Sequence, residues 1–158
     1  MLRISKLADY AALVLSAMAE RHDHTHTATV LAEQTGLNPP TTSKLLKLLA
    51  RAGLVASQRG TKGGYTLTRS PDAISAIHII EAVEGPMAMT ECTLATGLCE
   101  LEPSCSLGLQ WQSLSLAIRR ALAQISLADL NGPPFNPVIS ICLRPRTIYS
   151  KESAHGHA

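Results

Sequence analysis

Three of the chain's four cysteines, Cys92, Cys99 and Cys105, lie within fourteen residues of one another in the 158-residue sequence. Thiolates ligate iron–sulfur clusters and zinc, and a short loop that carries three of them can wrap a metal centre. Their spacing matches no ferredoxin signature and is wider than the cysteine pairs that structural zinc sites prefer. The residues therefore allow two interpretations, a metal centre or a group of ordinary reduced thiols, and spacing alone does not choose between them.

Two other sets of metal-binding residue types are weaker candidates. His22, His24 and His26 alternate in a polar stretch, which can attract a divalent metal but is more typical of a solvated loop. Cys142 is a rival thiol ligand near the C-terminus. The sequence shows no nucleophile motif, no phosphate-binding loop and no pair of catalytic carboxylates, so we do not expect an enzyme.

Charge is distributed unevenly along the chain, whose formal net charge is only +2. Residues 1–70 contain nine Lys and Arg against four Asp and Glu (+5), whereas residues 71–158 contain five against eight (−3). A basic first half predicts a polyanionic partner for that half alone. No run of roughly 18 apolar residues is present, so we expect no membrane partner. No signal-peptide pattern is visible either, which favours the cytoplasm, where thiols stay reduced.

The elements that would position these groups begin with a well-marked helix start. Asn38 is a good N-cap, and Pro39 suits the first helical position, so a helix is predicted from there to Gly53. Its buried stripe is expected at Leu45, Leu48, Leu49 and Ala52. Two helices are predicted before it and two strands after it, at residues 5–21, 28–35, 54–58 and 65–68. This order predicts a mainly α fold with a winged helix-turn-helix.

The exposed face of the third predicted helix is expected to enter the major groove of double-stranded DNA. The base-reading residues on this helix are predicted to be Thr41, Ser43 and Lys44, and the phosphate contacts Lys47 and Arg51. On the wing, Arg59 and Lys62 are expected to contact the DNA backbone or the minor groove. The alternative is a winged helix that contacts protein instead of DNA.

The second half of the chain is predicted to place the cysteines beside a long dimerisation helix. A helix is expected at 75–84, the cysteine loop at 86–105 and the long helix at 106–128, capped by Ser106. Apolar residues recur on the long helix with heptad spacing, which needs a partner helix, at Leu107, Trp111, Leu114, Ile118, Ala121 and Ile125. We therefore expect a homodimer, which would read a palindromic operator.

These patterns divide the chain into three units. Residues 1–84 form the predicted winged helix-turn-helix DNA-binding domain, and residues 85–130 the cysteine loop and dimerisation helix. Residues 131–158 begin with a linker rich in proline and are expected to be a disordered tail, in which residues 138–143 have the character of a strand.

Four motifs carry a family resemblance over residues 1–130. They are LRISKLADYA at 2–11, RGTKGGY at 59–65, EAVEGP at 81–86, and the triple-cysteine loop followed by Trp111. Together they resemble the winged-helix iron–sulfur regulators of the IscR and NsrR type. The segments MTEC at 89–92 and LADL at 127–130 are most similar to the branch of regulators of SUF-system iron–sulfur assembly.

The resemblance implies an iron–sulfur cluster, 2Fe–2S in preference to 4Fe–4S, with Cys92, Cys99 and Cys105 as ligands. Histidine ligands of relatives fall here on Gly108 and Gln110, whereas an aspartate ligand supplied by the other subunit falls on Asp9. It also implies a repressor of SUF-type assembly genes. The alternatives are a regulator of other genes that senses nitric oxide or redox state, a metal-free thiol switch, and a zinc-stabilised interaction protein.

Overall fold

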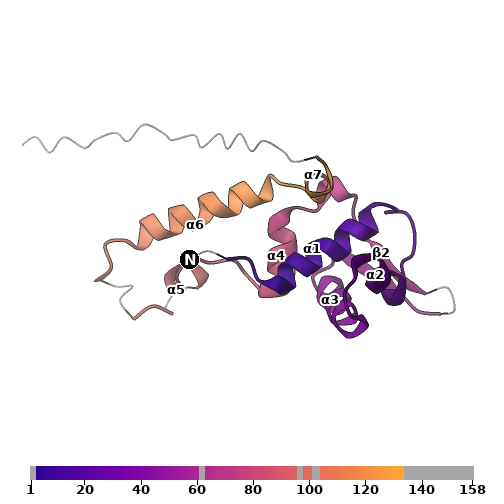
Figure 1. Cartoon of the computed structure of the whole chain (residues 1–158). Coiled ribbons are helices and arrows are strands. Elements are labelled where there is room, and N and C mark those ends of the chain that lie inside the picture. Colours follow the sequence, from indigo (N-terminus) through magenta and orange to yellow (C-terminus); the bar gives the residue numbers. More distant parts are fainter. Residues whose placement is uncertain (1–2, 61–62, 96–97, 101–103, 134–158) are drawn as a thin grey trace, which may run out of the picture.

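A computed structural model of the chain describes residues 3–60, 63–95, 98–100 and 104–133. Three sequence-based predictions lie outside this description: Lys62 on the wing, Cys142, and the tail from residue 134 with its strand at 138–143. The side chain of Cys92 is also outside it. Figure 1 shows the described elements in chain order.

The chain folds into helices with one small hairpin, which confirms the predicted mainly α, winged-helix fold class. The elements are α1 (Lys6–Ala19), α2 (Ala28–Thr35), α3 (Pro39–Arg51), β1 (Val55–Gln58), β2 (Gly64–Leu67), η1 (Pro71–Ala73), α4 (Ala76–Glu84), α5 (Glu91–Leu94), α6 (Gly108–Ala123) and α7 (Leu127–Asn131). Within the described residues, no helix combines the length and the apolar character that crossing a membrane requires.

Side chains cap the first helices as the sequence predicts. The Oγ of Ser5 accepts the Ala8 N–H at the start of α1, and the Oδ1 of Asn38 accepts the Thr41 N–H at the start of α3. Each cap satisfies a backbone donor that the helix itself leaves without a partner. At the end of α2, Gly36 has φ 69°, a left-handed conformation that favours glycine. These signals fix the turn between α2 and α3.

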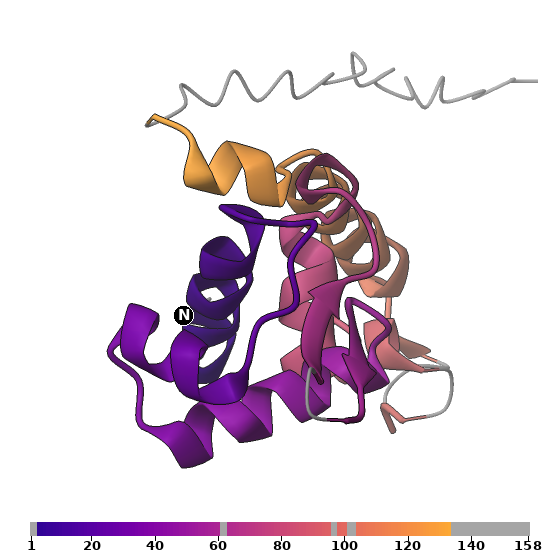
Figure 2. The same ribbon diagram turned by 90° about the vertical axis from the view of Figure 1, so that its right-hand side faces the viewer.

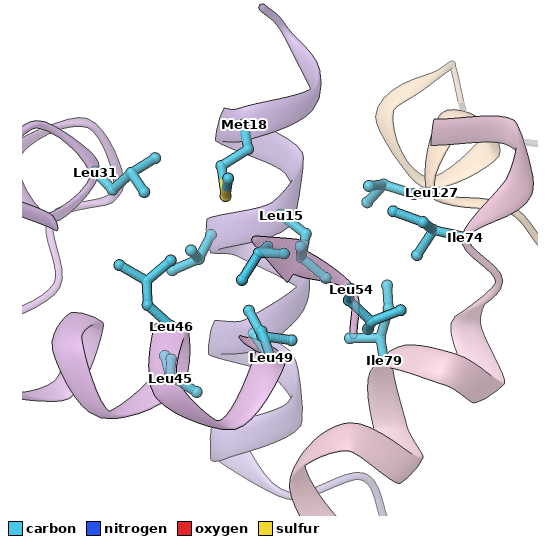
Figure 3. Packing of buried hydrophobic residues seen from close by; sticks show 13 residues of the cluster. Leu15, Met18, Leu31, Leu45, Leu46, Leu49, Leu54, Ile74, Ile79 and Leu127 are labelled. Atoms are coloured by element: carbon cyan, nitrogen blue, oxygen red, sulfur yellow. The ribbon is translucent and has the colours of Figure 1, made fainter. Parts of the chain in front are cut away.

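The hydrophobic core lies where α1 meets α3, α4 and α7 (Figure 3). Leu15 of α1 and Leu49 of α3 are fully buried, as are Ile74 and Leu127 from the second half of the chain. Burying each such side chain contributes about 1.5–3 kcal/mol. In Figure 2, α3 runs along the lower side of this unit and α7 lies on its upper side. The core therefore buries one face of α3 and leaves the opposite face of this helix exposed.

The wing is a two-stranded antiparallel hairpin in which Val55 pairs with Leu67 and Gln58 with Gly64. His26 extends it through two backbone hydrogen bonds of 2.8 Å with Tyr65. A Cβ at Gly64 would lie 2.5 Å from the His26 carbonyl oxygen, so this close approach requires glycine. The prediction of a solvated loop is wrong for His26, which is buried and makes a 3.1 Å hydrogen bond between its Nε2 and the Arg21 carbonyl.

The long helix predicted at 106–128 is wrong at both ends. It begins at Gly108, with Leu107 instead of Ser106 at the N-cap position and no side-chain cap. It ends at Ala123, and a new helix, α7, begins after Ser126. The Ser126 Oγ accepts the Asp129 N–H, and an Asp129 carboxylate oxygen accepts the Ser126 N–H in return. The Leu127 N–H also donates to the Ile74 carbonyl at 2.7 Å. Ile125 is therefore not part of a helical seam, because this turn carries Leu127 into the core.

The predicted cysteine loop contains one helical turn, α5, which the sequence analysis did not anticipate. The Oγ1 of Thr93 accepts the N–H groups of Met89 and Thr90, both at 3.1 Å, and donates to the Thr90 carbonyl. A side chain that bonds so many local backbone groups stabilises a short turn without a long apolar repeat. The backbone of Cys92 lies within this turn.

Candidate nucleic-acid interface and candidate metal centre

The outer face of α3 is basic and accessible. Lys44, Lys47 and Arg51 are exposed, whereas Thr41 and Ser43 are half-buried at its edge. A shallow depression in this face is lined by Pro40, Ser43, Lys44, Lys47, Leu48 and Arg51. The structure thus places four of the five α3 residues proposed for DNA around one depression, namely Ser43, Lys44, Lys47 and Arg51, whereas Thr41 does not line it.

The buried face of α3 is shifted from the predicted stripe. Leu45 and Leu49 are buried as expected, but the stripe is completed by Thr42 and Leu46. Leu48 is instead half-buried beside the lysines, and Ala52 is exposed. Thr42 is accommodated because its hydroxyl donates to the Asn38 carbonyl at 3.2 Å. A polar residue in the core escaped the sequence reasoning, which counted only apolar positions.

The tip of the wing is a tight turn that presents Arg59. Gly60 has φ 122° and its carbonyl accepts the Gly63 N–H at 2.9 Å. A Cβ at Gly63 would lie 2.4 Å from the Gln58 carbonyl oxygen, so the turn leaves no room for a side chain there. Arg59 is exposed beside this turn. The geometry places a cation on a narrow tip, which suits contact with a phosphate backbone or a minor groove.

The cysteine segment starts after α4 and ends at the N-terminal end of α6, which points away from the winged helix (Figure 1). Cys99 is half-buried and Cys105 is exposed, and both are free thiols. α5, which carries the backbone of Cys92, contacts α6. The three cysteines therefore belong to one segment that begins beside α4 and ends at α6.

An iron–sulfur group fits this segment by the chemistry of its donors, because thiolates are the usual ligands of such clusters. Among the described side chains, no three His, Cys, Asp or Glu residues gather as a metal site. Asp9 is exposed in the first turn of α1, and it lines an apolar groove of about 290 Å³ with residues of α4, α6 and α7. The donor types are present, and their assembly around a metal stays a prediction.

The surface of α6 carries apolar side chains that the described part of the chain leaves exposed. Leu107, Trp111 and Leu114 of the predicted seam are exposed, whereas Ile118 and Ala121 are half-buried. Ile118 lines a cavity with Ile80 and Pro86, among others, so part of the seam packs within the chain. The heptad analysis missed two further exposed apolar residues, Leu109 and Leu116, which are 76% and 46% exposed. These two residues lie on the opposite side of α6 from Leu107, Trp111 and Leu114, so exposed apolar side chains occur on two sides of this helix.

Comparisons with known proteins agree with this architecture. Residues 4–132 match the family model Rrf2, described as an iron-dependent transcriptional regulator. The transcriptional regulator IscR of Erwinia tasmaniensis is 32% identical over 133 residues, which cover 82% of this chain and 78% of that protein. These relatives are regulators of transcription and not enzymes.

Solved structures show the same fold. CymR of B. subtilis, the global cysteine regulator of that organism, superimposes with a TM-score of 0.63 at 30% identity, over 83% of this chain and 97% of that one. IscR of T. potens gives a TM-score of 0.58 at 28% identity, over 82% of this chain and 85% of that one. The match of the family model to most of the chain confirms the resemblance that the four motifs indicate: the chain belongs to the Rrf2 family of transcriptional regulators.

Proposed function

We propose that this regulator binds a palindromic operator as a homodimer and represses SUF-type iron–sulfur assembly genes when it holds a cluster. Support comes from the basic outer face of α3, the triple-cysteine segment and the exposed apolar face of α6, all in one chain. Relatives named IscR favour an iron–sulfur cluster. The three cysteines next to α6 are the observation that carries the proposal.

The DNA contacts follow from where the side chains lie. Thr41, Ser43 and Lys44 on the first half of α3 read base edges, because the N-terminal part of a recognition helix enters the groove most deeply. Lys47 and Arg51, one and two turns later, reach phosphates, and Arg59 follows the backbone or minor groove from the wing. Lys62 belongs to the same proposed wing contact.

In the proposed metal centre, Cys92, Cys99 and Cys105 are the thiolate ligands and Asp9 of the partner subunit is the fourth. The bound group, 2Fe–2S in preference to 4Fe–4S, supplies a centre that oxidants and nitric oxide damage. A carboxylate holds iron less tightly than a thiolate, so the ligand set favours a labile centre suited to sensing. The exposed Cys105 and Asp9 are accessible for ligation across a dimer contact.

One anaerobic preparation tests the proposal. Protein purified and reconstituted without oxygen should be coloured and should contain iron and acid-labile sulfide in equal amounts. A promoter fragment of a SUF-type operon should bind the loaded protein with strong salt dependence. Material that stays colourless and free of iron and sulfide after reconstitution would overturn the cluster, and loaded protein without affinity for that fragment would overturn the target genes.

A second candidate is a metal-free regulator that switches through its thiols. The observation in its favour is the likeness to CymR, the global cysteine regulator of B. subtilis, together with the free thiols Cys99 and Cys105. This candidate predicts iron-free protein whose DNA affinity changes reversibly with oxidation. A regulator that senses nitric oxide or redox state would differ from the proposed one in the genes that it controls. Genome-wide mapping of the DNA sites that the protein binds would identify those genes.

A further inference from the structure

A polar clamp joins α4, α6 and the start of the cysteine segment. Arg119 of α6 forms an ion pair with Glu81 of α4 through its Nη1 and the carboxylate Oε1. The same carboxylate oxygen accepts the Met87 N–H at 3.0 Å, and the same guanidinium nitrogen lies 3.3 Å from the Met87 carbonyl oxygen. Two side chains thus hold both polar backbone groups of one residue.

Met87 is the point at which the chain leaves α4 for the cysteines. Gly85, with φ 85°, ends α4, and its N–H donates to the Glu81 carbonyl at 3.1 Å. The Glu81 carbonyl therefore stabilises the end of α4, and the Glu81 carboxylate holds the backbone of Met87 in the segment that follows. Cys92 is five residues beyond Met87. A change in the path of the cysteine segment reaches the Met87 backbone first, and the clamp ties that backbone to two helices.

The other side of Glu81 faces the end of α3 and the base of the hairpin. Glu81, His78 and Ala82 of α4 line a cavity of about 210 Å³ together with Leu54, Arg69 and Ala52, which follow α3 or flank the hairpin. Arg69 is the basic residue that lines this cavity, whereas Arg119 is the basic residue that pairs with Glu81 from α6. α4 also packs directly against α3. Glu81 is thus placed where the cysteine segment, α6 and the base of the wing meet.

We infer that the Glu81–Arg119 clamp on Met87 couples the state of the cysteine segment to α3 and the wing. Glu81 and Arg119 act as positioning residues: they are not among the residues proposed to bind DNA or metal, and they transmit a displacement of Met87 to α4 and so to α3. This inference deepens the proposed function, because it names the route by which the cysteine segment alters DNA binding. The coupling depends only on contacts within the chain, so it can be measured in protein that holds neither DNA nor a cluster.

Amide hydrogen exchange of the full chain, with Cys142→Ser as background, tests the coupling. Alkylation of the remaining cysteines with iodoacetamide perturbs the segment, and exchange is followed in residues 45–58, which cover the end of α3 and β1. We expect alkylation to change protection there by at least about fivefold, the lower end of usual allosteric coupling. In Arg119→Gln the change should fall below about twofold.

Two variants separate coupling from general damage. Arg119→Lys keeps a donor cation and should transmit the change. Arg120→Gln removes the same charge from the next residue of α6, which is exposed and for which the described residues show no ion pair, so it should also transmit it. Thermal unfolding of each variant checks that it is folded, and Glu81→Gln replaces Arg119→Gln should the latter unfold.

Two results would overturn the inference: equal transmission in Arg119→Gln and Arg120→Gln, or no response of residues 45–58 in the background protein. Neither result bears on whether the chain holds a cluster or represses SUF-type genes, because neither DNA nor iron enters the measurement. An iron-free protein would conversely leave the coupling measurable.

Discussion

Exposure distinguishes the two thiols whose side chains the structure describes. Cys105 is exposed beside the start of α6, whereas Cys99 is half-buried. Reaction of a thiol depends on access as well as on its thiolate fraction, so Cys105 should be alkylated before Cys99 in the metal-free protein. Spectrometry of the partly alkylated protein would show this order.

The ligand role of each cysteine is tested one residue at a time. Cys92→Ala, Cys99→Ala and Cys105→Ala should each abolish the visible absorbance of the reconstituted protein, because a cluster that loses a thiolate ligand is not retained. Cys142→Ala is the matched control and should keep the absorbance. Loss of colour only in the Cys142 variant would move the site to the tail.

Replacement of Asp9 should affect the cluster less than replacement of a cysteine. Asp9→Ala should still acquire the cluster but lose it faster in air, because three thiolates remain and only the carboxylate is removed. The decay of visible absorbance measures this lifetime, with Asp23→Ala as an exposed carboxylate control. An unchanged lifetime in Asp9→Ala would eliminate it as a ligand.

On the recognition helix, Lys44 is the residue proposed to read bases. Lys44→Ala should weaken specific operator binding by about 1–3 kcal/mol and relax base preference at one position, as loss of a good base contact does. Lys47→Ala should instead weaken all sequences alike and lower the salt slope by about one. Competition binding at several salt concentrations separates the two; full affinity in Lys44→Ala would show that the reader lies elsewhere.

At the scale of elements, short capping signals decide where helices start and stop. Asn38 and Pro39 predicted the start of α3 from sequence because a cap needs only neighbouring residues. The break after Ala123 was missed, although Ser126 and Asp129 carry a capping pattern, because the apolar spacing continues through Ile125. The burial of Leu127 against Ile74 depends on a partner fifty residues away, which local periodicity does not contain.

The same limit applies to the candidate site. The basic face of α3 could be predicted because Lys44, Lys47 and Arg51 share one helix face by spacing alone. The ion pair between Glu81 and Arg119 could not, because it depends on how α6 crosses α4. The assembly of the three cysteines around a metal stays a prediction, because a segment of irregular backbone has no fixed period from which side-chain positions follow.

The cap of α7 makes stability depend on pH. Hydrogen bonds from the Ser126 hydroxyl and backbone hold the pKa of the Asp129 carboxyl below its ordinary value. A carboxyl whose folded pKa is lowered stabilises the fold above its unfolded pKa, and this contribution is lost as pH falls through the folded value. Asp129→Asn should therefore flatten the acid side of a plot of unfolding temperature against pH, whereas Glu33→Gln, on the surface of α2, should not. Identical acid limbs in Asp129→Asn and the parent would show that this cap contributes nothing.

At the scale of the whole molecule, the exposed apolar face of α6 governs assembly. Leu114, 43% exposed in the single chain, is proposed to be buried between two copies. Leu114→Lys places a charge in that contact and should convert the dimer to a monomer, as measured by sedimentation. Gln112→Lys adds the same charge at another exposed position of α6 and should leave the dimer intact. A dimer of unchanged affinity in Leu114→Lys would place the contact on another surface.

Because α6 extends away from the winged helix, the two ends of the cysteine segment lie at different distances from the Glu81–Arg119 clamp: the Cys92 end is near it and the Cys105 end is far from it. Arg119 and Gly108 lie on α6 eleven residues apart, which is about 16 Å of helix. Through that arm, a shift of ~1.4 Å at the far end arrives at Arg119 as a tilt of only about 5°. Met87, by contrast, meets Glu81 and Arg119 without any intervening arm. A displacement at the Cys92 end therefore reaches Glu81 and Arg119 directly, whereas an equal displacement at the Cys105 end is reduced to a small tilt of α6. The same displacement should consequently move the wing more when it is applied at the Cys92 end.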